Sequence, residues 1–248
     1  MMAKRFDNKV VVITGGTDGI GLATAKAFAN EGALVYITGR NAVRLNTAVA
    51  EIGHGAVGVQ GDVSNAADLD RLYAKIKGDH GRVDVVYANA GVSESAPLDQ
   101  IQDDHFDRVF DINVKGTVYT VQKALPLMSA GGSIVLAGSG AGSKGFASLS
   151  VYSATKAAIR SFARTWTIDL KSRGIRVNVV SPGMVLTPAM KTYLQDNDGA
   201  EDWMKGAIPF GRLAEADEVA KAVMFLASKE SSFVGGAELM VDGGFVAV

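Results

Sequence analysis

The sequence lacks cysteine and is poor in proline and aromatic residues, with five prolines and 7% Phe, Trp and Tyr. Without cysteine, the protein can form no disulfide and no thiolate metal site, so its chemistry does not depend on the redox compartment. The longest apolar stretches, such as 9–14, are far too short to cross a membrane. Met1–Asn8 holds Lys4 and Arg5 but no apolar segment, which argues against a signal peptide and favours a cytoplasmic protein.

An excess of charge of one sign is also missing. The formal net charge is -1 and the isoelectric point is about 6.3, so no positive field attracts nucleic acid or an anionic membrane. His54, His80 and His105 are scattered without ligand spacing, which predicts no metal site. The remaining profile, 248 residues with 48% hydrophobic and 21% charged, is typical of one globular domain spanning 1–248.

Short runs rich in Val and Ile alternate with segments of helical period, which indicates repeated β-α-β units, a parallel sheet and the α/β class. The strands are predicted at Val10–Thr14, Ala33–Thr38, Ala56–Gly61, Val83–Ala88, Ser133–Ala137, Arg176–Val180 and Glu238–Val241. The helices are predicted at Ile20–Glu31, Ala42–Glu51, Ala66–Lys77, Asp103–Ser129, Tyr152–Arg173 and Asp217–Ala227. Because the strand runs are apolar rather than alternating, we expect helices on both faces of the sheet.

The segment 187–209 breaks this rhythm. It carries two prolines, a turn signal at 196–199, and Tyr193 and Trp203, which look exposed. It is either a lid over a substrate site or a surface helix pair with ordinary packing aromatics.

A glycine-rich turn follows the first predicted strand and opens the first helix. The sequence Thr14-Gly15-Gly16-Thr17-Asp18-Gly19-Ile20-Gly21 lets the backbone approach a pyrophosphate, and the helix amino terminus supplies N–H donors for that anion. A glycine motif alone can mark only a tight turn. The strand before it and the helix after it favour a dinucleotide-binding site.

The end of the second strand bears on the choice of cofactor. Dinucleotide folds that bind NAD place a carboxylate there, whereas this chain has Thr38-Gly39-Arg40. A guanidinium can bind the 2′-phosphate of NADP through charge-assisted hydrogen bonds. NADP(H) is therefore the predicted cofactor, with NAD(H) as the alternative, because Arg40 can also be a solvated surface residue and Asp18 disfavours a phosphate.

Two further groups follow the third and fourth predicted strands. Asp62-Val63 can meet the adenine amino group, although Asp62 is equally suited to cap the next helix. Asn89-Ala90-Gly91 lies at the carboxyl edge of the sheet, where ligands bind in such folds, and Asn89 can also be a turn residue.

Tyr152 and Lys156 are four residues apart in a segment of helical period, so both side chains lie on one face. A nearby ammonium and a bound nicotinamide cation favour the phenolate, so we expect the pKa of Tyr152 to fall. Ser139 follows the fifth strand and can hold a substrate oxygen. Asn113 lies in a polar-flanked helix and can anchor a water chain. Taken singly, Ser139 can also be a turn serine and Asn113 a helix-capping or bulge asparagine. A serine hydrolase is disfavoured because 138–140 lacks the elbow pattern and a partner histidine.

The ordered set of these motifs resembles the short-chain dehydrogenase/reductase family over nearly the whole chain. The matching motifs are Thr14-Gly15-x-x-x-Gly19-x-Gly21, Asp62, Asn89-Ala90-Gly91, Asn113, Ser139, Tyr152-x-x-x-Lys156, and Pro182-Gly183 with Thr187. The resemblance implies a single-domain Rossmann-type fold, a doubly wound parallel sheet of seven strands, with Asn113, Ser139, Tyr152 and Lys156 as the catalytic tetrad. It also implies that Val185 and Thr187 contact the nicotinamide carboxamide.

Together, motif and resemblance predict a set of cofactor-binding residues. These are Gly15, Thr17, Asp18, Gly19, Ile20, Gly21, Arg40, Asp62, Val63, Asn89, Ala90, Gly91, Tyr152, Lys156, Pro182, Gly183, Val185 and Thr187. The apolar substrate pocket is placed at Ala141, Gly142, Leu149, Met184 and Tyr193, all of which are equally suited to the core.

By the resemblance, NADPH gives hydride to a ketone carbon, Tyr152 delivers the proton and Ser139 stabilises the oxyanion, while Lys156 binds the ribose and passes protons toward Asn113. The family also implies a homotetramer, with 103–129 and 152–173 as its dimer-forming helices. A rival function is a 3-oxoacyl-carrier-protein reductase: Arg173 suits an acidic carrier, but Ala130 stands where a basic residue is common. An NADP-sensing regulator without turnover is a rival of another class. The tail 241–245 is expected either against a partner subunit or at the end of its own sheet.

Overall fold

The computed structural model describes residues 4–248, so the first three residues of the amino-terminal segment lie outside it. Its strands are β1 (Val10–Ile13), β2 (Leu34–Gly39), β3 (Val57–Gln60), β4 (Val83–Ala88), β5 (Met128–Ala137), β6 (Arg176–Pro182) and β7 (Glu238–Val241). Its α-helices are α1 (Gly19–Asn30), α2 (Ala42–Ile52), α3 (Ala66–His80), α4 (Asp103–Phe110), α5 (Gly116–Ala124), α6 (Ser150–Asp169), α7 (Pro188–Asp196), α8 (Ala200–Ala207) and α9 (Ala216–Ala227). Each predicted strand and helix has a counterpart.

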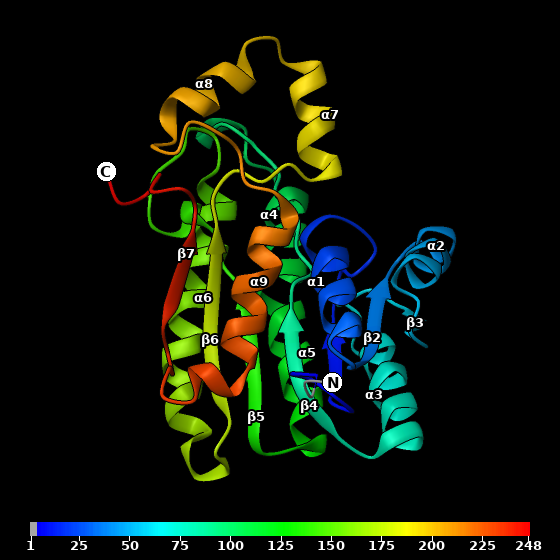
Figure 1. The fold of residues 1–248 in the computed structure, drawn as a ribbon. Helices are drawn as coiled ribbons and strands as arrows, with labels where there is room; N and C mark the ends of the chain where they lie inside the picture. The colour runs from blue at the N-terminus through cyan, green and yellow to red at the C-terminus, as the bar shows by residue number, and fades with distance from the viewer. Residues whose placement is uncertain (1–3) are drawn as a thin grey trace.

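The strands form one parallel sheet of seven in the order β3-β2-β1-β4-β5-β6-β7. The chain moves outward from β1 to β3 and then returns to the other side of β1, which places a topological switch point between β1 and β4. Figure 1 shows helices on both sides of this sheet, with α9 and α1 in front of it. The predicted doubly wound, single-domain α/β fold is confirmed.

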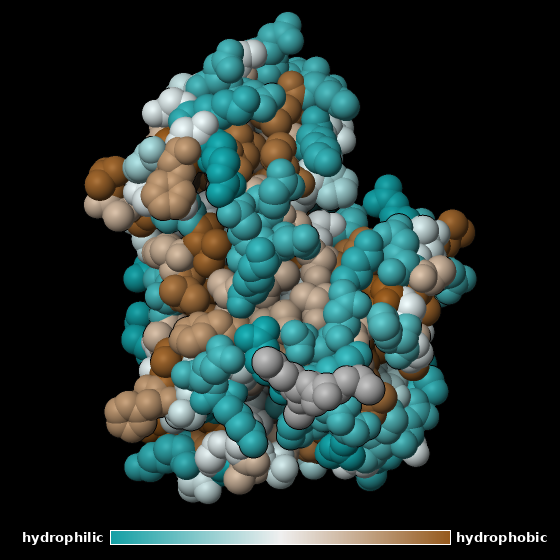
Figure 2. Space-filling view, viewed as in Figure 1, coloured by the Kyte–Doolittle hydropathy of each residue, from teal (hydrophilic) through white to brown (hydrophobic). Residues whose placement is uncertain are grey.

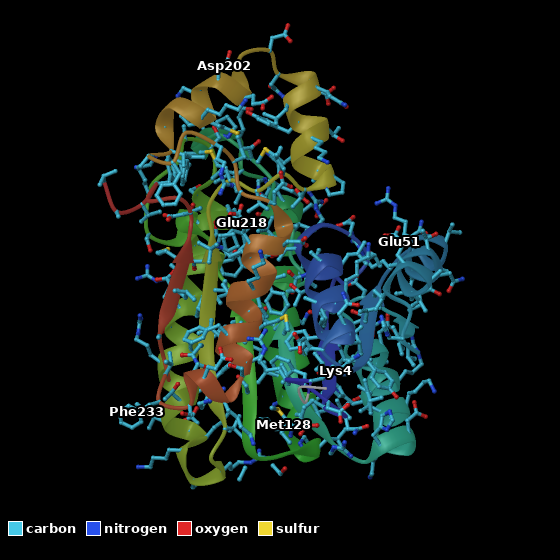
Figure 3. All side chains as sticks on the ribbon, viewed as in Figure 1. Lys4, Glu51, Met128, Asp202, Glu218 and Phe233 are labelled. Carbon is cyan, nitrogen blue, oxygen red and sulfur yellow. The ribbon has the colours of Figure 1, made fainter. Side chains whose placement is uncertain are left out.

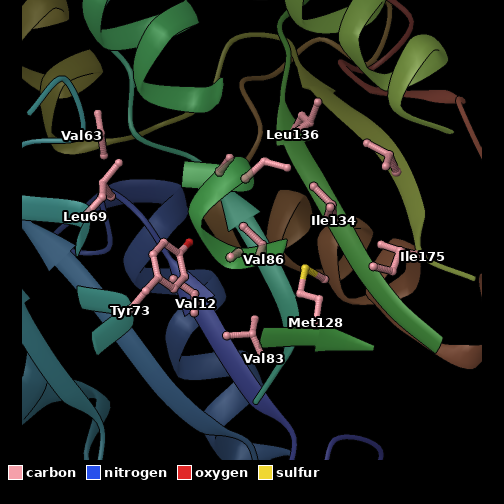
Figure 4. Close-up of a cluster of buried hydrophobic side chains, with 14 of the residues drawn as sticks. Val12, Val63, Leu69, Tyr73, Val83, Val86, Met128, Ile134, Leu136 and Ile175 are labelled. Atoms are coloured by element: carbon pink, nitrogen blue, oxygen red, sulfur yellow. The ribbon is translucent and has the colours of Figure 1, made fainter. Parts of the chain in front are cut away.

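Two apolar layers hold the helices to the sheet. One layer joins strand residues such as Val12, Val86 and Ile134 to α3, α5 and α6, and Figure 4 shows part of it around Tyr73. The other layer joins the opposite sheet face to α1, α2 and α9, and includes Phe28 at 0% exposure. Burial of such large side chains stabilises the sheet by about 1.5–3 kcal/mol each.

The expectation that every strand is covered on both faces is wrong at the edges. β3 alternates between half-buried and exposed residues, and β7 is half-buried throughout. Both are edge strands, so helices cover them less completely than the central strands. The tail 241–245 was expected either against a partner subunit or at the end of its own sheet. Residues 238–241 form the last strand of the protein's own sheet, beside β6, which supports the second alternative for the start of the tail.

The single long helix predicted over Asp103–Ser129 is also wrong. It is divided into α4, a π-helical segment at Asp111–Lys115 and α5, and it ends before Pro126, which lies in a short 3-10 turn. Proline has no N–H to continue the helical hydrogen bonds. β5 then begins at Met128, before the predicted start, with Gly131 at φ +87° in an irregular stretch.

The second long helix, predicted over Tyr152–Arg173, begins and ends earlier, as α6. A 3-10 turn at Lys171–Arg173 follows it, and Gly174 at φ +62° turns the chain into β6. Segment 187–209 folds as the helix pair α7 and α8, which lies at the top of Figure 1. Within residues 4–248, no helix is both long and apolar enough to cross a membrane.

Candidate active site

The carboxyl ends of the parallel strands meet at one edge, where the loops after several strands line a cleft of about 390 Å³. Thirteen of the predicted cofactor-binding residues line it: Gly15, Thr17, Asp18, Gly19, Ile20, Gly21, Arg40, Asp62, Val63, Asn89, Ala90, Gly91 and Thr187. The structure therefore brings the glycine turn, Arg40 and the loops after β3 and β4 together around one space.

The glycine turn has the geometry that an anion site needs. Gly15 and Gly19 have φ values of +65° and +50°, and a Cβ atom at Gly21 would overlap the carbonyl oxygen of Gly15. Asp18 begins α1 without a side-chain cap, and the first turn holds no acidic residue. The backbone N–H groups of the first turn of α1 and the positive end of its helix dipole are therefore available to a phosphate.

Asn89 fixes this turn to the neighbouring strand. Its side-chain Nδ2 donates to the carbonyl oxygens of Thr14 and Gly15 at 2.9 and 3.0 Å, and its backbone N–H donates to Thr14 Oγ1 at 3.1 Å. The residue is therefore a brace between β4 and the glycine turn as well as part of the cleft wall.

Two arginines line the cleft near the end of β2. Arg40 is exposed after β2, with Nη1 3.9 Å from Asp62 Oδ2. Arg44, which the sequence analysis missed, lines the same cleft from the first turn of α2. The sequence does contain a signal for this position, because Asn41 is a typical helix-capping residue three positions before Arg44. The Asn41 side chain caps α2 by accepting from the Arg44 N–H at 3.0 Å.

The remaining cleft residues were also not anticipated. They are Thr38, Gly39, Asn41, Gly61, Val92, Ile112 and Ala189. Gly39 is required by close approach, because a Cβ atom there would overlap Thr17 Cγ2. The other members are neighbours of predicted residues, or reach the cleft from α7 and from the π-helical segment.

Asp62 is not the cap of the following helix, so that alternative is wrong. Its Oδ1 accepts from the N–H and the hydroxyl of Ser64 at 2.9 and 2.7 Å. Asn65 caps α3 instead, by accepting from the Ala67 N–H. This arrangement fixes the Asp62 carboxylate at the cleft wall with Oδ2 toward Arg40.

Tyr152 and Lys156 lie one turn apart on α6, with Lys156 Nζ 5.5 Å from the centre of the Tyr152 ring. Lys156 is 6% exposed and donates to the Ala137 carbonyl oxygen at 2.9 Å. Burial lowers the pKa of Lys156 to about 8. Burial also raises the pKa of Tyr152, an effect that the Ser139 hydroxyl opposes, so the expected fall is wrong for the protein's own residues.

Ser139 reaches the same place from the end of β5. Its Oγ accepts from the Ala141 N–H at 3.2 Å and begins a short 3-10 turn at Gly140–Gly142. A Cβ atom at Gly142 would lie 3.1 Å from the Lys156 carbonyl carbon, so this turn rests directly on the backbone of α6. The Ser139 hydroxyl lies within hydrogen-bonding reach of the Tyr152 side chain.

Asn113 lies in the π-helical segment and is 1% exposed. Its Oδ1 accepts from the Val92 N–H at 2.8 Å, while Nδ2 donates to the Val92 oxygen and to Thr155 Oγ1. Both amide hydrogens are therefore engaged by the protein. A Cβ atom at Gly91 would lie 3.2 Å from Asn113 Oδ1 and 3.5 Å from Lys156 Nζ, so Gly91 separates these two groups.

Five predicted cofactor residues lie outside the walls of this cleft: Tyr152, Lys156, Pro182, Gly183 and Val185. Val185 is 5% exposed and forms a bridge with Ala214, whereas Thr187 caps α7 and would touch a Cβ atom at Gly19. Among residues 4–248, no cluster of three His, Asp or Glu side chains could hold a metal ion.

The residues expected in the substrate pocket are spread over different places. Ala141 is buried, Tyr193 is exposed on α7, and Met184 lines a second cavity of about 310 Å³. That cavity also includes Ile208 and Phe210. The expectation that Arg173 lies near the site mouth is wrong, since it precedes β6 at the amino edge of the sheet and donates to the Leu125 and Met128 carbonyl oxygens, at 2.6 and 2.9 Å respectively.

Comparison with known proteins identifies this arrangement. A family model described as enoyl-(acyl carrier protein) reductase matches residues 15–246. A solved structure of a short chain dehydrogenase/reductase family protein superposes with a TM-score of 0.88 at 41% identity, over 98% of this chain and 100% of that one. The chain belongs to the short-chain dehydrogenase/reductase family.

This dehydrogenase/reductase also has curated relatives of matching length. It is 45% identical over 250 residues to oxidoreductase asL5 of Sarocladium schorii, covering 99% of this chain and 98% of that protein. It is 39% identical over 252 residues to cis-4-hydroxycyclohexanecarboxylate dehydrogenase of Sinomonas cyclohexanicum, covering 100% of both. The protein is therefore an oxidoreductase of a family that uses nicotinamide cofactors, and its cleft and glycine turn fit such a dinucleotide.

Proposed function

We propose that this dehydrogenase/reductase transfers hydride between NADP(H) and a ketone or secondary alcohol. The observation that carries the proposal is the placement of Tyr152, Lys156 and Ser139 beside a cleft whose wall is the glycine turn. A phenol, an ammonium and a hydroxyl at the carboxyl edge of the sheet supply a proton donor, a cation and a hydrogen-bond donor.

In the reducing direction, Tyr152 delivers a proton to the carbonyl oxygen and the Ser139 hydroxyl donates a hydrogen bond to that oxygen. Because burial raises the pKa of Tyr152, its phenol is protonated at neutral pH and is ready to act as the acid. Lys156, with a pKa of about 8, is mainly an ammonium at neutral pH and would hold the nicotinamide ribose. The bound nicotinamide supplies the hydride.

Asn113 has a positioning task in this scheme. Its amide clamps the Val92 backbone through bonds of 2.8 and 2.9 Å, which holds the loop that carries Gly91 between Asn113 and Lys156. With both amide hydrogens engaged, a proton relay at Asn113 must use an oxygen of this residue as the acceptor.

The proposed preference for NADP rests on Arg40 and Arg44. No carboxylate ends β2, and Arg40 and Arg44 both line the cleft at that end, where their guanidinium groups can bind a 2′-phosphate. We expect Arg40→Asp to raise the KM for NADPH by about 10- to 100-fold, the loss of one charged hydrogen bond of about 1.5–3 kcal/mol. A higher kcat/KM with NADH than with NADPH in the wild type contradicts this preference.

The substrate class is tested by following NADPH absorbance with cyclohexanone, acetophenone and an open-chain ketone. The relative that acts on cis-4-hydroxycyclohexanecarboxylate favours a cyclic secondary alcohol or ketone. The rival 3-oxoacyl-carrier-protein reductase is supported by a 37% identical relative of that name from Thermotoga maritima, but Arg173 and Ala130 lie at the amino edge of the sheet, away from the site. Turnover only of a carrier-bound thioester would favour the rival. Tight NADPH binding without turnover of any carbonyl would indicate a regulator.

We also propose that α7 and α8 form a lid over the substrate. Thr187 caps α7 through the Met190 N–H at 3.2 Å and lines the cofactor cleft, so α7 begins at the cofactor. Figure 2 shows a polar outer surface on this top layer, with apolar side chains gathered beneath it. The expected homotetramer is likewise a proposal, which the exposed Phe106 on α4 and Ile168 on α6 support.

A further inference from the structure

The loop that carries Ser139 is tied to β7 through an arginine of α6. Arg160 Nη1 donates to the Gly142 carbonyl oxygen at 2.8 Å, and Arg160 Nε lies 2.6 Å from Glu238 Oε2 in an ion pair. Glu238 is the first residue of β7, and its Oε1 accepts from the Ser181 hydroxyl of β6 at 2.7 Å. One guanidinium therefore joins the serine loop to the edge of the sheet.

The ion pair is well placed to fix the loop. The Arg160 and Glu238 side chains are 31% and 16% exposed, so water screens them less than it screens a surface pair. Arg160 lies on α6 about two turns after Tyr152, on the same side of the helix. The helix that carries the proposed acid thus also holds the loop that carries Ser139, which sets the two hydroxyl groups relative to each other.

The C-terminal tail holds the same loop at a second point. Lys144 Nζ donates to the Phe245 carbonyl oxygen at 2.8 Å and lies 4.3 Å from the centre of the Phe245 ring. The Phe146 ring stacks on Phe245, which is 5% exposed. A Cβ atom at Gly140 would lie 2.9 Å from Val246 Cγ2, so the tail also packs beside the turn that follows Ser139.

We propose that Arg160, with Glu238 as its partner, is a positioning residue for Ser139, and that Lys144 and the tail secure the same loop. Ser139 Oγ bonds to the Ala141 N–H of its own turn, so its position follows that of the turn. The inference rests on the proposed role of Ser139 in binding the substrate oxygen. Misplacing such a group by about 1 Å can cost up to 10²-fold in rate.

The test is a double-mutant cycle on kcat with NADPH and cyclohexanone, or the best ketone of the panel, using Arg160→Met, Ser139→Ala and the double variant. We expect Arg160→Met to lower kcat by about tenfold when Ser139 is present and by less than about twofold in the Ser139→Ala background. The Kd of NADPH should stay within about twofold, because Arg160 lies outside the cofactor cleft. Arg160→Lys should restore part of the loss.

Arg164→Met is the matched control, one turn further along α6 and exposed, and should leave kcat unchanged. If Arg160→Met does not fold, Glu238→Gln replaces it in the cycle, because it removes the charge and keeps the side-chain size. If Ser139→Ala lowers kcat but Arg160→Met lowers kcat equally in both Ser139 backgrounds, or not at all, the positioning role of Arg160 is overturned and the role of Ser139 stands. Full activity of Ser139→Ala overturns both this inference and the proposed role of Ser139.

Discussion

Replacing Lys156 with methionine should stabilise the protein at pH 7. The ammonium is 6% exposed, and burial lowers the pKa of Lys156 from 10.5 to about 8. Because one pKa unit corresponds to about 1.4 kcal/mol, keeping this charge buried at pH 7 costs about 3 kcal/mol. Lys156→Met removes that cost and loses the 2.9 Å bond to the Ala137 oxygen, worth about 1 kcal/mol. The expected net gain in unfolding free energy is about 2 kcal/mol.

The gain should depend on pH. The unfolded lysine keeps its proton up to about pH 10.5, whereas the folded one loses it near pH 8. Between these values the unfolded state binds more protons, so the wild type gains stability as the pH rises, by about 2 kcal/mol between pH 7 and 9.5. The variant lacks this gain, and its advantage should nearly vanish at pH 9.5.

Urea unfolding at pH 7 and pH 9.5 measures this difference, at equal protein concentrations because assembly shifts apparent stability. Lys26→Met, at an exposed lysine of α1, is the control and should change stability by less than about 0.5 kcal/mol at both pH values. A Lys156→Met variant that is less stable than wild type at pH 7, or a difference that does not change with pH, refutes the reasoning.

Three further substitutions test the cleft, helix α3 and the sheet. Gly21→Ala would place a Cβ atom onto the Gly15 oxygen, so it should destabilise the protein by about 2 kcal/mol and raise the KM for NADPH, while Gly78→Ala, which meets open space, should stabilise α3 by about 0.5–1 kcal/mol. If Gly21→Ala and Gly78→Ala change the melting temperature and the KM for NADPH equally, the close packing of Gly21 on the Gly15 oxygen is contradicted. Although burial opposes it, bonds from Lys9, the Val10 N–H and Arg82 lower the pKa of Asp84, so Asp84→Asn should cost about 2 kcal/mol at pH 7. Because the folded pKa is depressed, the wild type loses this advantage as the pH falls below about 3.9, and a difference that persists in urea unfolding at lower pH would exclude the mechanism.

The central sheet could be predicted from the sequence because its strands leave a strong local signal. Val83–Ala88 is apolar except for Asp84, and it appears as β4 with the predicted bounds. The glycine turn was equally clear, since Gly15 and Gly19 need φ values that other residues avoid. Both signals are local, and neither depends on distant partners.

The features that were missed depend on tertiary contacts. The apolar period runs unbroken through 103–124, so it does not reveal the π-helical segment that turns Asn113 toward the Val92 backbone. The raised pKa of Tyr152 reflects burial, which its spacing from Lys156 does not show. Figure 3 shows Glu218 at the upper end of α9, in the middle of the molecule, and Phe233 at its lower left, an arrangement that follows from the fold and not from the sequence spacing.

Arg173 is a different case, because its position could have been deduced. The residue precedes a predicted strand, and the start of a parallel strand lies at the edge opposite the ligand site. Its guanidinium instead ties the 3-10 turn to carbonyl oxygens near the start of β5. Charge alone therefore suggested a position near the site, whereas the topology places Arg173 at the opposite edge of the sheet.

The most direct test of the account is the effect of Tyr152→Phe on turnover and on cofactor binding measured in parallel. The substitution removes the proton-donating hydroxyl and keeps the ring on α6 beside Lys156. We expect kcat for NADPH oxidation with the best ketone to fall by about 10³-fold, while the Kd of NADPH from fluorescence titration stays within about twofold. A kcat within about tenfold of wild type would contradict the role of Tyr152 as the acid.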